Sequence, residues 1–329
     1  VMIPPDLWSP TMGIWQGWTA AHRWSIQKPR NPVRIARKGT IGILAPMPLA
    51  DPDEIEPTAR TARPQSLIIT TYGAYSRSIG GWFSVSALLT LLGEVGIDDP
   101  SVRSALSRFK RRGVLTGERR EGVAGYALGE SARRTFDIGD SRVLERRFPP
   151  PNKGWVLAAF SIPESARDVR YRLRSRLARV GFAQVGGGLW IAPRQLESDV
   201  KYVVELLDIR AHVDLFIAEH SAFRATQEAV SQWWDLDAIA LAYEEFTAEY
   251  APLAASWART RVSPDPVKAF ADYTRALTAW RPLPYVDPGL PREYLPKAWA
   301  GDKATETFFA LHDRLARPAM QFVEKVASI

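Results

Sequence analysis

The sequence contains no cysteine, so disulfide bridges and thiolate metal sites are excluded. It also has no run of about 18 apolar residues, the length that a membrane-spanning helix requires. Its first residues lack the charged-then-apolar pattern of a secretion signal. These absences favour a cytoplasmic protein with no membrane partner.

Motifs of catalysis are equally scarce. The sequence holds four histidines, and none has the H-E-x-x-H spacing of a zinc-binding helix. It has no P-loop, no nucleophile elbow and no dinucleotide-binding fingerprint. The glycine run at 186–188 joins two predicted strands instead of opening a helix, so it predicts a turn and not a phosphate cradle. We therefore expect no catalytic residue, no metal site and no cofactor, and predict that the protein is not an enzyme.

What the chain does have is a local excess of positive charge. Its 329 residues leave room for two or three domains, and its net charge is +7. Between residues 101 and 148, twelve Arg and Lys oppose six Asp and Glu, an excess of six. A basic excess confined to one segment is the expected electrostatic footprint of a nucleic-acid-binding protein.

A basic amphipathic helix is predicted at the start of this segment. Asp98 or Asp99 can cap it, Pro100 suits its first turn and Gly113 can end it. At about 100° per residue, one side is apolar and contains Val102, Ala105, Leu106 and Phe109. Arginine can grip phosphate or guanine, and serine lets the backbone approach DNA closely. We predict that five residues on the opposite side face the major groove of DNA: Arg103, Ser104, Ser107, Arg108 and Arg111. The alternative is a solvated basic helix on an ordinary surface.

The sequence before this helix favours the DNA-binding interpretation. Two apolar helices are predicted over 66–75 and 85–95, and Ser84 is placed to cap the second. A helix, a short turn and a second helix with a basic outer face form the helix-turn-helix arrangement.

The sequence after the helix predicts a hairpin. Two strand-like runs at 114–118 and 123–128 flank a charged turn that ends in glycine. A hairpin directly after a recognition helix is a wing, and Arg119 and Arg120 at its tip would contact backbone phosphate or the minor groove. The alternative is a surface hairpin that happens to carry two arginines.

Prolines divide the rest of the chain. Ten of the 25 prolines lie in the first 64 residues, and we expect 1–63 to be a poorly structured extension. A triple proline at 149–151 marks the end of the predicted winged helix-turn-helix domain, 64–148. Residues 149–220 then read as a ferredoxin-like βαββαβ domain, with strands at 155–162, 182–186, 189–192 and 211–218 and helices at 164–180 and 195–207. The fold class is therefore predicted as α+β.

Residues 221–329 read as an all-helical C-terminal domain. Helices are predicted over 231–250, 267–279 and 303–327. This part holds five tryptophans, at 233, 234, 257, 280 and 299. Aromatic residues at that density favour a core, and the alternative is an apolar pocket for an aromatic or acyl ligand.

With these parts in view, the sequence resembles the PaaX-like transcriptional regulators, over roughly 64–317. The resemblance rests on Gly80-Gly81-Trp82, on the run 102–109 (VRSALSRF) with Gly113, and on Gly154-Trp155. The most telling segment is Asp-Pro-Gly-Leu-Pro at 287–291 with the residues that follow it to 301, because helix-turn-helix proteins in general have no reason to carry it.

The resemblance implies a function that the residues alone do not reveal. It implies a homodimeric repressor of an aromatic-acid (phenylacetate-type) catabolic operon. Such a repressor binds a double-stranded DNA operator and is released by an aryl-CoA thioester of the phenylacetyl-CoA type. It also implies a middle domain like the small CRISPR-associated ferredoxin-fold nucleases. The ligand-binding residues stay unknown at this point.

Two other functions compete with a DNA-binding repressor. The nucleases of that fold resemble one another in an acidic residue at the end of the first strand, and here the run at 158–162 has no carboxylate, which disfavours phosphodiester chemistry. The alternative is a regulator that binds a CoA thioester or RNA and uses its helix-turn-helix for protein contacts.

Overall fold

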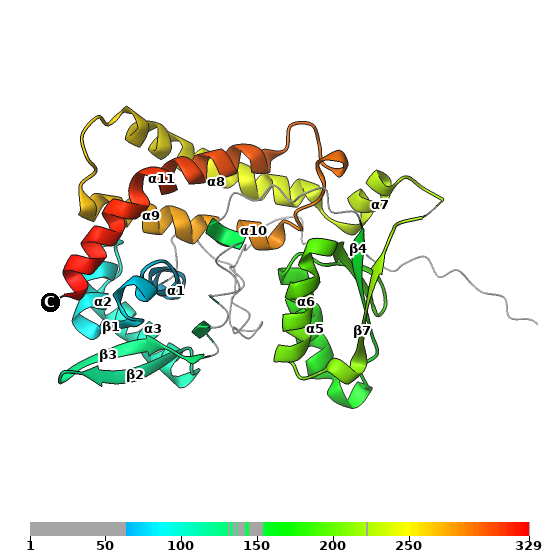
Figure 1. Cartoon of the computed structure of the whole chain (residues 1–329), viewed down its shortest axis with the longest axis horizontal. Helices are drawn as coiled ribbons and strands as arrows, with labels where there is room; N and C mark the ends of the chain where they lie inside the picture. Colours follow the sequence, from blue (N-terminus) through cyan, green and yellow to red (C-terminus); the bar gives the residue numbers. More distant parts are fainter. Residues whose placement is uncertain are drawn as a thin grey trace, which may run out of the picture. The chain divides into compact units, whose positions relative to one another are not determined.

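The computed structural model describes residues 64–130, 132–133, 136, 142–144, 154–221 and 223–328 (Figure 1). Within them the fold is mixed, with helices and two antiparallel sheets, so the α+β prediction is confirmed at that level. The predicted N-terminal extension, the triple proline and most of the residues between Glu130 and Gly154 lie outside the described residues.

The first part of the described chain combines three helices with a three-stranded sheet. In chain order its elements are α1 (Pro64–Tyr75), the 3₁₀ turn η2 (Ser76–Ile79), β1 (Trp82–Ser84), α2 (Val85–Glu94), α3 (Asp99–Arg111), β2 (Leu115–Arg120) and β3 (Val123–Leu128). The strands pair antiparallel in the order β1-β3-β2. The predicted helices and hairpin are present, and Ser84 caps α2 by accepting a hydrogen bond of 3.0 Å from the Ala87 amide.

Strand β1 was not predicted from the sequence. It pairs Phe83 with Tyr126 of β3. A β-carbon on Gly125, the partner of Ser84, would lie 2.3 Å from the Phe83 carbonyl oxygen and 2.3 Å from the Trp82 ring. Glycine at 125 therefore lets the indole of Trp82 lie against β3.

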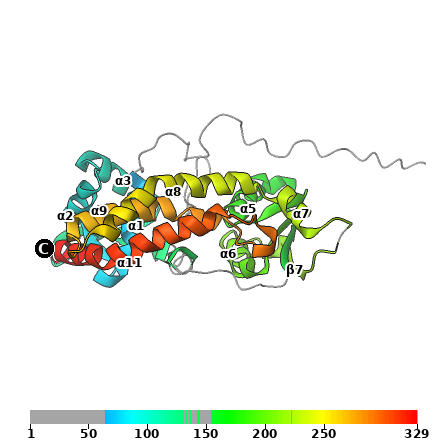
Figure 2. The ribbon, with the colours of Figure 1, turned by 90° about the horizontal axis from the view of Figure 1, so that it is seen from above.

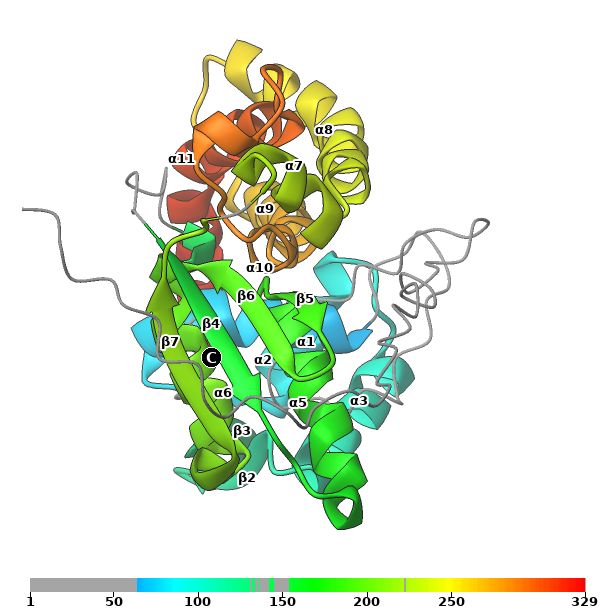
Figure 3. The same ribbon diagram turned by 90° about the vertical axis from the view of Figure 1, so that its right-hand side faces the viewer.

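The middle part is a four-stranded sheet with two helices. Its elements are β4 (Trp155–Phe160), α5 (Arg167–Arg179), β5 (Ala183–Gly186), β6 (Leu189–Pro193), α6 (Glu197–Leu206) and β7 (Val213–Ala218). The strand order is β5-β6-β4-β7, and every described pair is antiparallel. Figure 3 shows α5 and α6 on one face of this sheet, where Val156, Ala158, Leu173, Leu177 and Val200 are buried together. The predicted order of strands and helices is confirmed.

The last part is helical. It contains α7 (Thr226–Trp233), α8 (Leu236–Arg259), α9 (Pro266–Trp280), α10 (Leu283–Val286) and α11 (Ala300–Ala327). The single helix predicted over 231–250 is wrong, because α7 ends at Trp233 and Asp235 begins α8 by accepting a hydrogen bond of 3.0 Å from the Ala238 amide. Helix α11 lies alongside α8 and α9 (Figure 2).

One hydrophobic core joins the first part to the last. A single cluster of buried side chains includes residues of α1, α2 and α3 together with residues of α8, α9 and α11. Two buried polar contacts lie between α1 and α9: the Tyr75 hydroxyl is 2.9 Å from the Thr274 hydroxyl, and Thr278 donates to Thr70 at 2.9 Å. Segments about 200 residues apart therefore stabilise each other directly.

This shared core gives a testable expectation. Leu88 in α2 is fully buried in it, so replacing it by Ala should lower the free energy of unfolding by about 2–5 kcal/mol. Hydrogen exchange should speed up in α9 and α11 as well as in α2 and α3. The matched control is Leu173→Ala, since Leu173 is equally buried in the separate cluster of the middle sheet. Faster exchange confined to 64–130 in the Leu88 variant would contradict a common core.

Candidate nucleic-acid interface

Helix α3 is fixed at both ends by local hydrogen bonds. Asp98 caps it, accepting from the Ser101 amide at 2.9 Å and from the Ser101 hydroxyl at 2.8 Å. These hydrogen bonds lower the pKa of Asp98, because they stabilise its charged form. After the last turn Gly113 takes a φ of +68°, and the Val114 amide donates back to the Phe109 carbonyl at 3.0 Å. Of the two predicted caps, the structure uses Asp98.

The two faces of α3 divide as the sequence predicted. Val102, Ala105, Leu106 and Phe109 are at most 6 % exposed and lie in the core cluster that also contains Leu88 and Leu92 of α2. The opposite face is exposed, and it carries Arg103, Ser104, Ser107, Arg108 and Arg111. The packing of the apolar face thus points the basic face away from the core.

The guanidinium groups on this face are available for a ligand. Among the residues that the structure describes, no hydrogen bond or ion pair engages the side chain of Arg103, Arg108 or Arg111. Lys110 adds a further exposed cation at the end of the helix, with its ammonium 3.5 Å from where a β-carbon on Gly117 would lie. Lys110 is not among the DNA-facing residues predicted from the sequence, although it stands next to Arg111 in the chain.

The hairpin differs from the prediction in the length of its turn. Arg119 and Arg120 are the last residues of β2, paired with Ala124 and Val123, and lie outside the turn itself. The turn is Glu121-Gly122, with φ of +50° and +82°. Positive φ at both central residues is the geometry of a type I′ turn, which matches the twist of the two strands.

The two arginines of the hairpin have different surroundings. Arg119 donates to the Gly122 carbonyl at 2.7 Å and is otherwise exposed. Arg120 pairs with Glu118 at 2.9 Å, donates to the Gly80 carbonyl at 3.1 Å and lies over the Trp82 ring at 5.4 Å. Arg120 therefore links β2 to the chain before β1, and Arg119 is the freer of the two.

The C-terminal tryptophans are mostly core residues. Trp234, Trp257, Trp280 and Trp299 are each at most 7 % exposed. The indole N–H of three of them has an acceptor at 3.0 Å: the Gly181 carbonyl for Trp234, Asp272 for Trp257 and the Val143 carbonyl for Trp280. Trp233 is half-buried. This supports the core interpretation over the ligand pocket.

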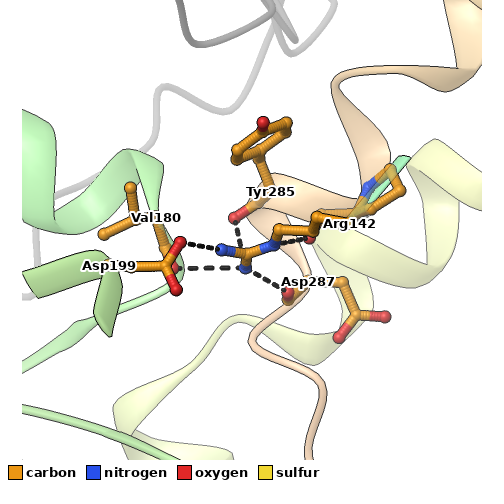
Figure 4. A network of polar contacts seen from close by, with 6 residues as sticks. Arg142, Val180, Asp199, Tyr285 and Asp287 are labelled. Atoms are coloured by element: carbon orange, nitrogen blue, oxygen red, sulfur yellow. Dashed lines mark hydrogen bonds and ion pairs between the residues drawn. The ribbon is translucent and has the colours of Figure 1, made fainter. Parts of the chain in front are cut away.

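A polar network that the sequence did not reveal surrounds Arg142 (Figure 4). Its guanidinium pairs with Asp199 at 3.0 Å. It also donates to backbone carbonyls of Pro284 at 2.7 Å, Val180 at 3.3 Å, Asp287 at 3.3 Å and Tyr285 at 3.5 Å, and it lies 5.0 Å from the centre of the Tyr285 ring. These partners are 38 to 145 residues away, so no local pattern could have indicated them.

The same network explains the Asp-Pro-Gly segment. The Asp287 carboxylate accepts from the Tyr243 hydroxyl at 2.9 Å and from the Gly289 amide at 2.8 Å. Burial raises the pKa of Asp287 and of Asp199, in both cases against the opposing effect of the Arg142 charge. Gly289 has a φ of +65°, which glycine adopts without strain. The segment thus forms a turn that supplies the Asp287 carbonyl as an acceptor to Arg142.

Within the described ranges, no group of three or more His, Asp or Glu side chains is arranged to hold a metal ion. In the same part of the chain, every helix is too short or too polar to cross a membrane.

Comparison with known proteins identifies relatives of this chain. Three family descriptions match consecutive segments: "PaaX-like protein" at 63–132, "PaaX protein central Cas2-like domain" at 149–230 and "PaaX-like protein C-terminal domain" at 234–325. The chain is 26% identical over 266 residues to "Transcriptional repressor PaaX" of Escherichia coli, covering 79% of this chain and 83% of that protein. It is also similar to the solved structure of "Uncharacterized protein Rv0674 from Mycobacterium tuberculosis", with 23% identity, a TM-score of 0.48, and coverage of 80% and 99%.

The Arg142–Asp199 pair gives a prediction about pH. Replacing Arg142 by Met leaves a largely buried carboxylate without its cation, and we expect a loss of about 3–5 kcal/mol in the free energy of unfolding near neutral pH. The pKa of Asp199 in the folded protein then rises further above its unfolded value. Between those two pKa values the folded state binds more protons, so the stability of the variant should recover as the pH falls from neutral through the raised pKa of Asp199.

Denaturant titrations at several pH values measure this effect. Asp199→Asn in the same background should restore part of the loss and remove the recovery at low pH. A profile of the Arg142 variant parallel to that of the unchanged protein would contradict the assigned role of the pair.

Proposed function

The chain belongs to the PaaX-like protein family, and from this premise we propose that it is a transcriptional regulator that binds double-stranded DNA through α3. The observation that carries the proposal is the exposed basic face of α3, whose Arg103, Arg108 and Arg111 have no partner among the described residues. Unpaired guanidinium groups on a helix seated by its apolar side are suited to phosphate and base contacts in a groove.

The proposed architecture has three domains after residue 63. A winged helix-turn-helix over 64–148 is supported by α2 and α3 followed directly by the β2–β3 hairpin. A ferredoxin-like domain over 149–220 is supported by the β5-β6-β4-β7 strand order with both helices on one face. An all-helical domain over 221–329 is supported by the succession α7 to α11.

The residues of the interface take different roles in this proposal. Five residues of α3 face the major groove: Arg103, Ser104, Ser107, Arg108 and Arg111. The hairpin contacts backbone phosphate or the minor groove through Arg119 and, more weakly, through Arg120, because the guanidinium of Arg120 is already engaged by Glu118 and Gly80.

The biological role is proposed from the family. The Escherichia coli relative is described as a transcriptional repressor. We extend this to a homodimer that reads a palindrome, with half-sites about 10–10.5 bp apart or a multiple of that spacing. It represses an operon for the breakdown of an aromatic acid of the phenylacetate type and is released by an aryl-CoA thioester such as phenylacetyl-CoA.

Single substitutions separate base reading from phosphate contact. Replacing Arg103 by Ala should cost about 1–3 kcal/mol of binding free energy to the operator and relax the preference at one base position. Replacing Arg119 by Ala should weaken binding to all sequences alike and reduce the slope of log K against log salt by about one. Arg317→Ala, on an exposed position of α11, serves as the control. Equal, sequence-independent losses at both positions would rule out this division of roles.

The effector is tested by a salt titration of binding to DNA from the protein's own upstream region, with and without phenylacetyl-CoA. We expect specific binding whose affinity rises as the salt concentration falls and which is lost when the thioester is added. Specific binding that ignores the thioester would refute the effector and leave the regulator. A salt-independent interaction would favour a protein-contact role for the helix-turn-helix instead.

A further inference from the structure

Arg281 carries a cation that nothing in the described chain neutralises. It follows α9, and its amide closes the helix by donating to the Leu277 carbonyl at 2.9 Å. Its Nε is buried and has no hydrogen-bond partner, and among the described residues no ion pair or hydrogen bond engages the rest of its guanidinium. Burial lowers the pKa of Arg281 to about 10, so the group is still charged at neutral pH.

An unpaired cation in this position is costly to the folded protein. Buried charges are normally paired with an opposite charge or saturated by hydrogen bonds. Arg142 shows the usual solution, since one carboxylate and several carbonyls surround its guanidinium. Arg281 has no such acceptors among the residues that the structure describes. Arg281 is half-buried as a whole, and of its unpartnered guanidinium nitrogens only Nε is fully enclosed.

Tyr285 supplies a second free donor beside it. It lies four residues further on, and Arg281 is one of the charges that act on its hydroxyl. No described residue accepts or donates a hydrogen bond to that hydroxyl. Burial raises the pKa of Tyr285, which keeps the hydroxyl protonated and able to donate. Among the described residues, neither the Arg281 guanidinium nor the Tyr285 hydroxyl has a hydrogen-bond acceptor, although the charges of Arg142 and Asp199 also act on Tyr285.

We propose that Arg281 and Tyr285 form a binding site for an oxyanion, a phosphate or a carboxylate, on a small-molecule ligand of this protein. Guanidinium groups bind both anions through paired N–H donors. Arg142 takes no part in this contact, because its own acceptors already occupy it. This site would bind part of the ligand that releases the protein from DNA, and the effect of binding on DNA rests on the function proposed above.

The surroundings of the site connect it to the DNA-binding part. Trp280 donates to the Val143 carbonyl at 3.0 Å, and Arg142 donates to the carbonyls of Pro284 and Tyr285. The residues on either side of the anion site therefore hold the chain at 142–143, which follows the β2–β3 hairpin. An anion bound at Arg281 acts on the backbone segment that anchors this connection.

The test measures binding to the full chain directly, without DNA. Inorganic phosphate, pyrophosphate, coenzyme A and phenylacetate are titrated by calorimetry and by thermal unfolding against the unchanged protein, Arg281→Met, Tyr285→Phe and the control Arg317→Met. We expect at least one probe to bind and to raise the unfolding temperature of the unchanged protein and of the control. Arg281→Met should weaken that probe at least tenfold, and Tyr285→Phe should weaken it several-fold.

Two further readouts separate the outcomes. Without a probe, Arg281→Met should unfold at the same or a higher temperature than the unchanged protein, because an unpaired charge is removed, so its loss of binding is not a loss of folding. Binding of the phosphate probes alone assigns a phosphate source, and binding of phenylacetate alone assigns a carboxylate. The site is refuted if no probe binds the unchanged protein or if Arg281→Met binds as well as the control. Since no DNA is present, a failure of the proposed operator binding leaves this result unaffected.

Discussion

The burial of α1 is the constraint on which the arrangement of the first and last parts depends. Seven of its twelve residues are buried, and they are distributed around the whole helix: Leu67, Ile68, Ile69, Thr70, Thr71, Tyr72 and Tyr75. A helix that is apolar on all sides must be covered on all sides. Here α3 contacts it in the first part and α9 in the last. The basic face of α3 is therefore supported by a core to which the C-terminal helices contribute.

Local signals in the sequence were sufficient for most of the elements. The cap at Asp98, the apolar stripe of α3 and the Ser84 cap of α2 are set by residues within one or two turns of each other, and all three are present. The order of strands and helices in the middle part could be predicted from local patterns as well. The break before α8 has a local signal, the Asp235 cap, that the sequence analysis did not use, and a tertiary contact adds to it, since the Trp234 indole donates to the Gly181 carbonyl, 53 residues away.

Three features could not be predicted from the sequence, because none of them is set by a repeating local pattern of residues. Strand β1 has three residues, too few for a period, and exists because β3 offers Gly125 and a free edge. The two-residue turn at Glu121 was read as longer because glutamate is an unusual residue at positive φ. The exposed residues of α3 could be predicted because their signal is local, whereas Arg142 acquires its environment from distant segments.

The contrast between Arg142 and Arg281 bears on how the protein could respond to a ligand. Both act on the segment 280–287, and burial imposes a desolvation cost on each. Arg142 offsets it with the Asp199 carboxylate and with carbonyls of two segments, at 180 and at 284–287, which fixes their relative positions. Within the described part of the chain Arg281 has no such compensation, so one arginine holds the segment firmly and the charge of the other is left unpaired there. A ligand that binds Arg281 would do so next to residues that already hydrogen-bond to the chain at 142–143, which follows the β2–β3 hairpin. The coupling therefore needs no long chain of intermediates, only the few hydrogen bonds from Trp280 and Arg142.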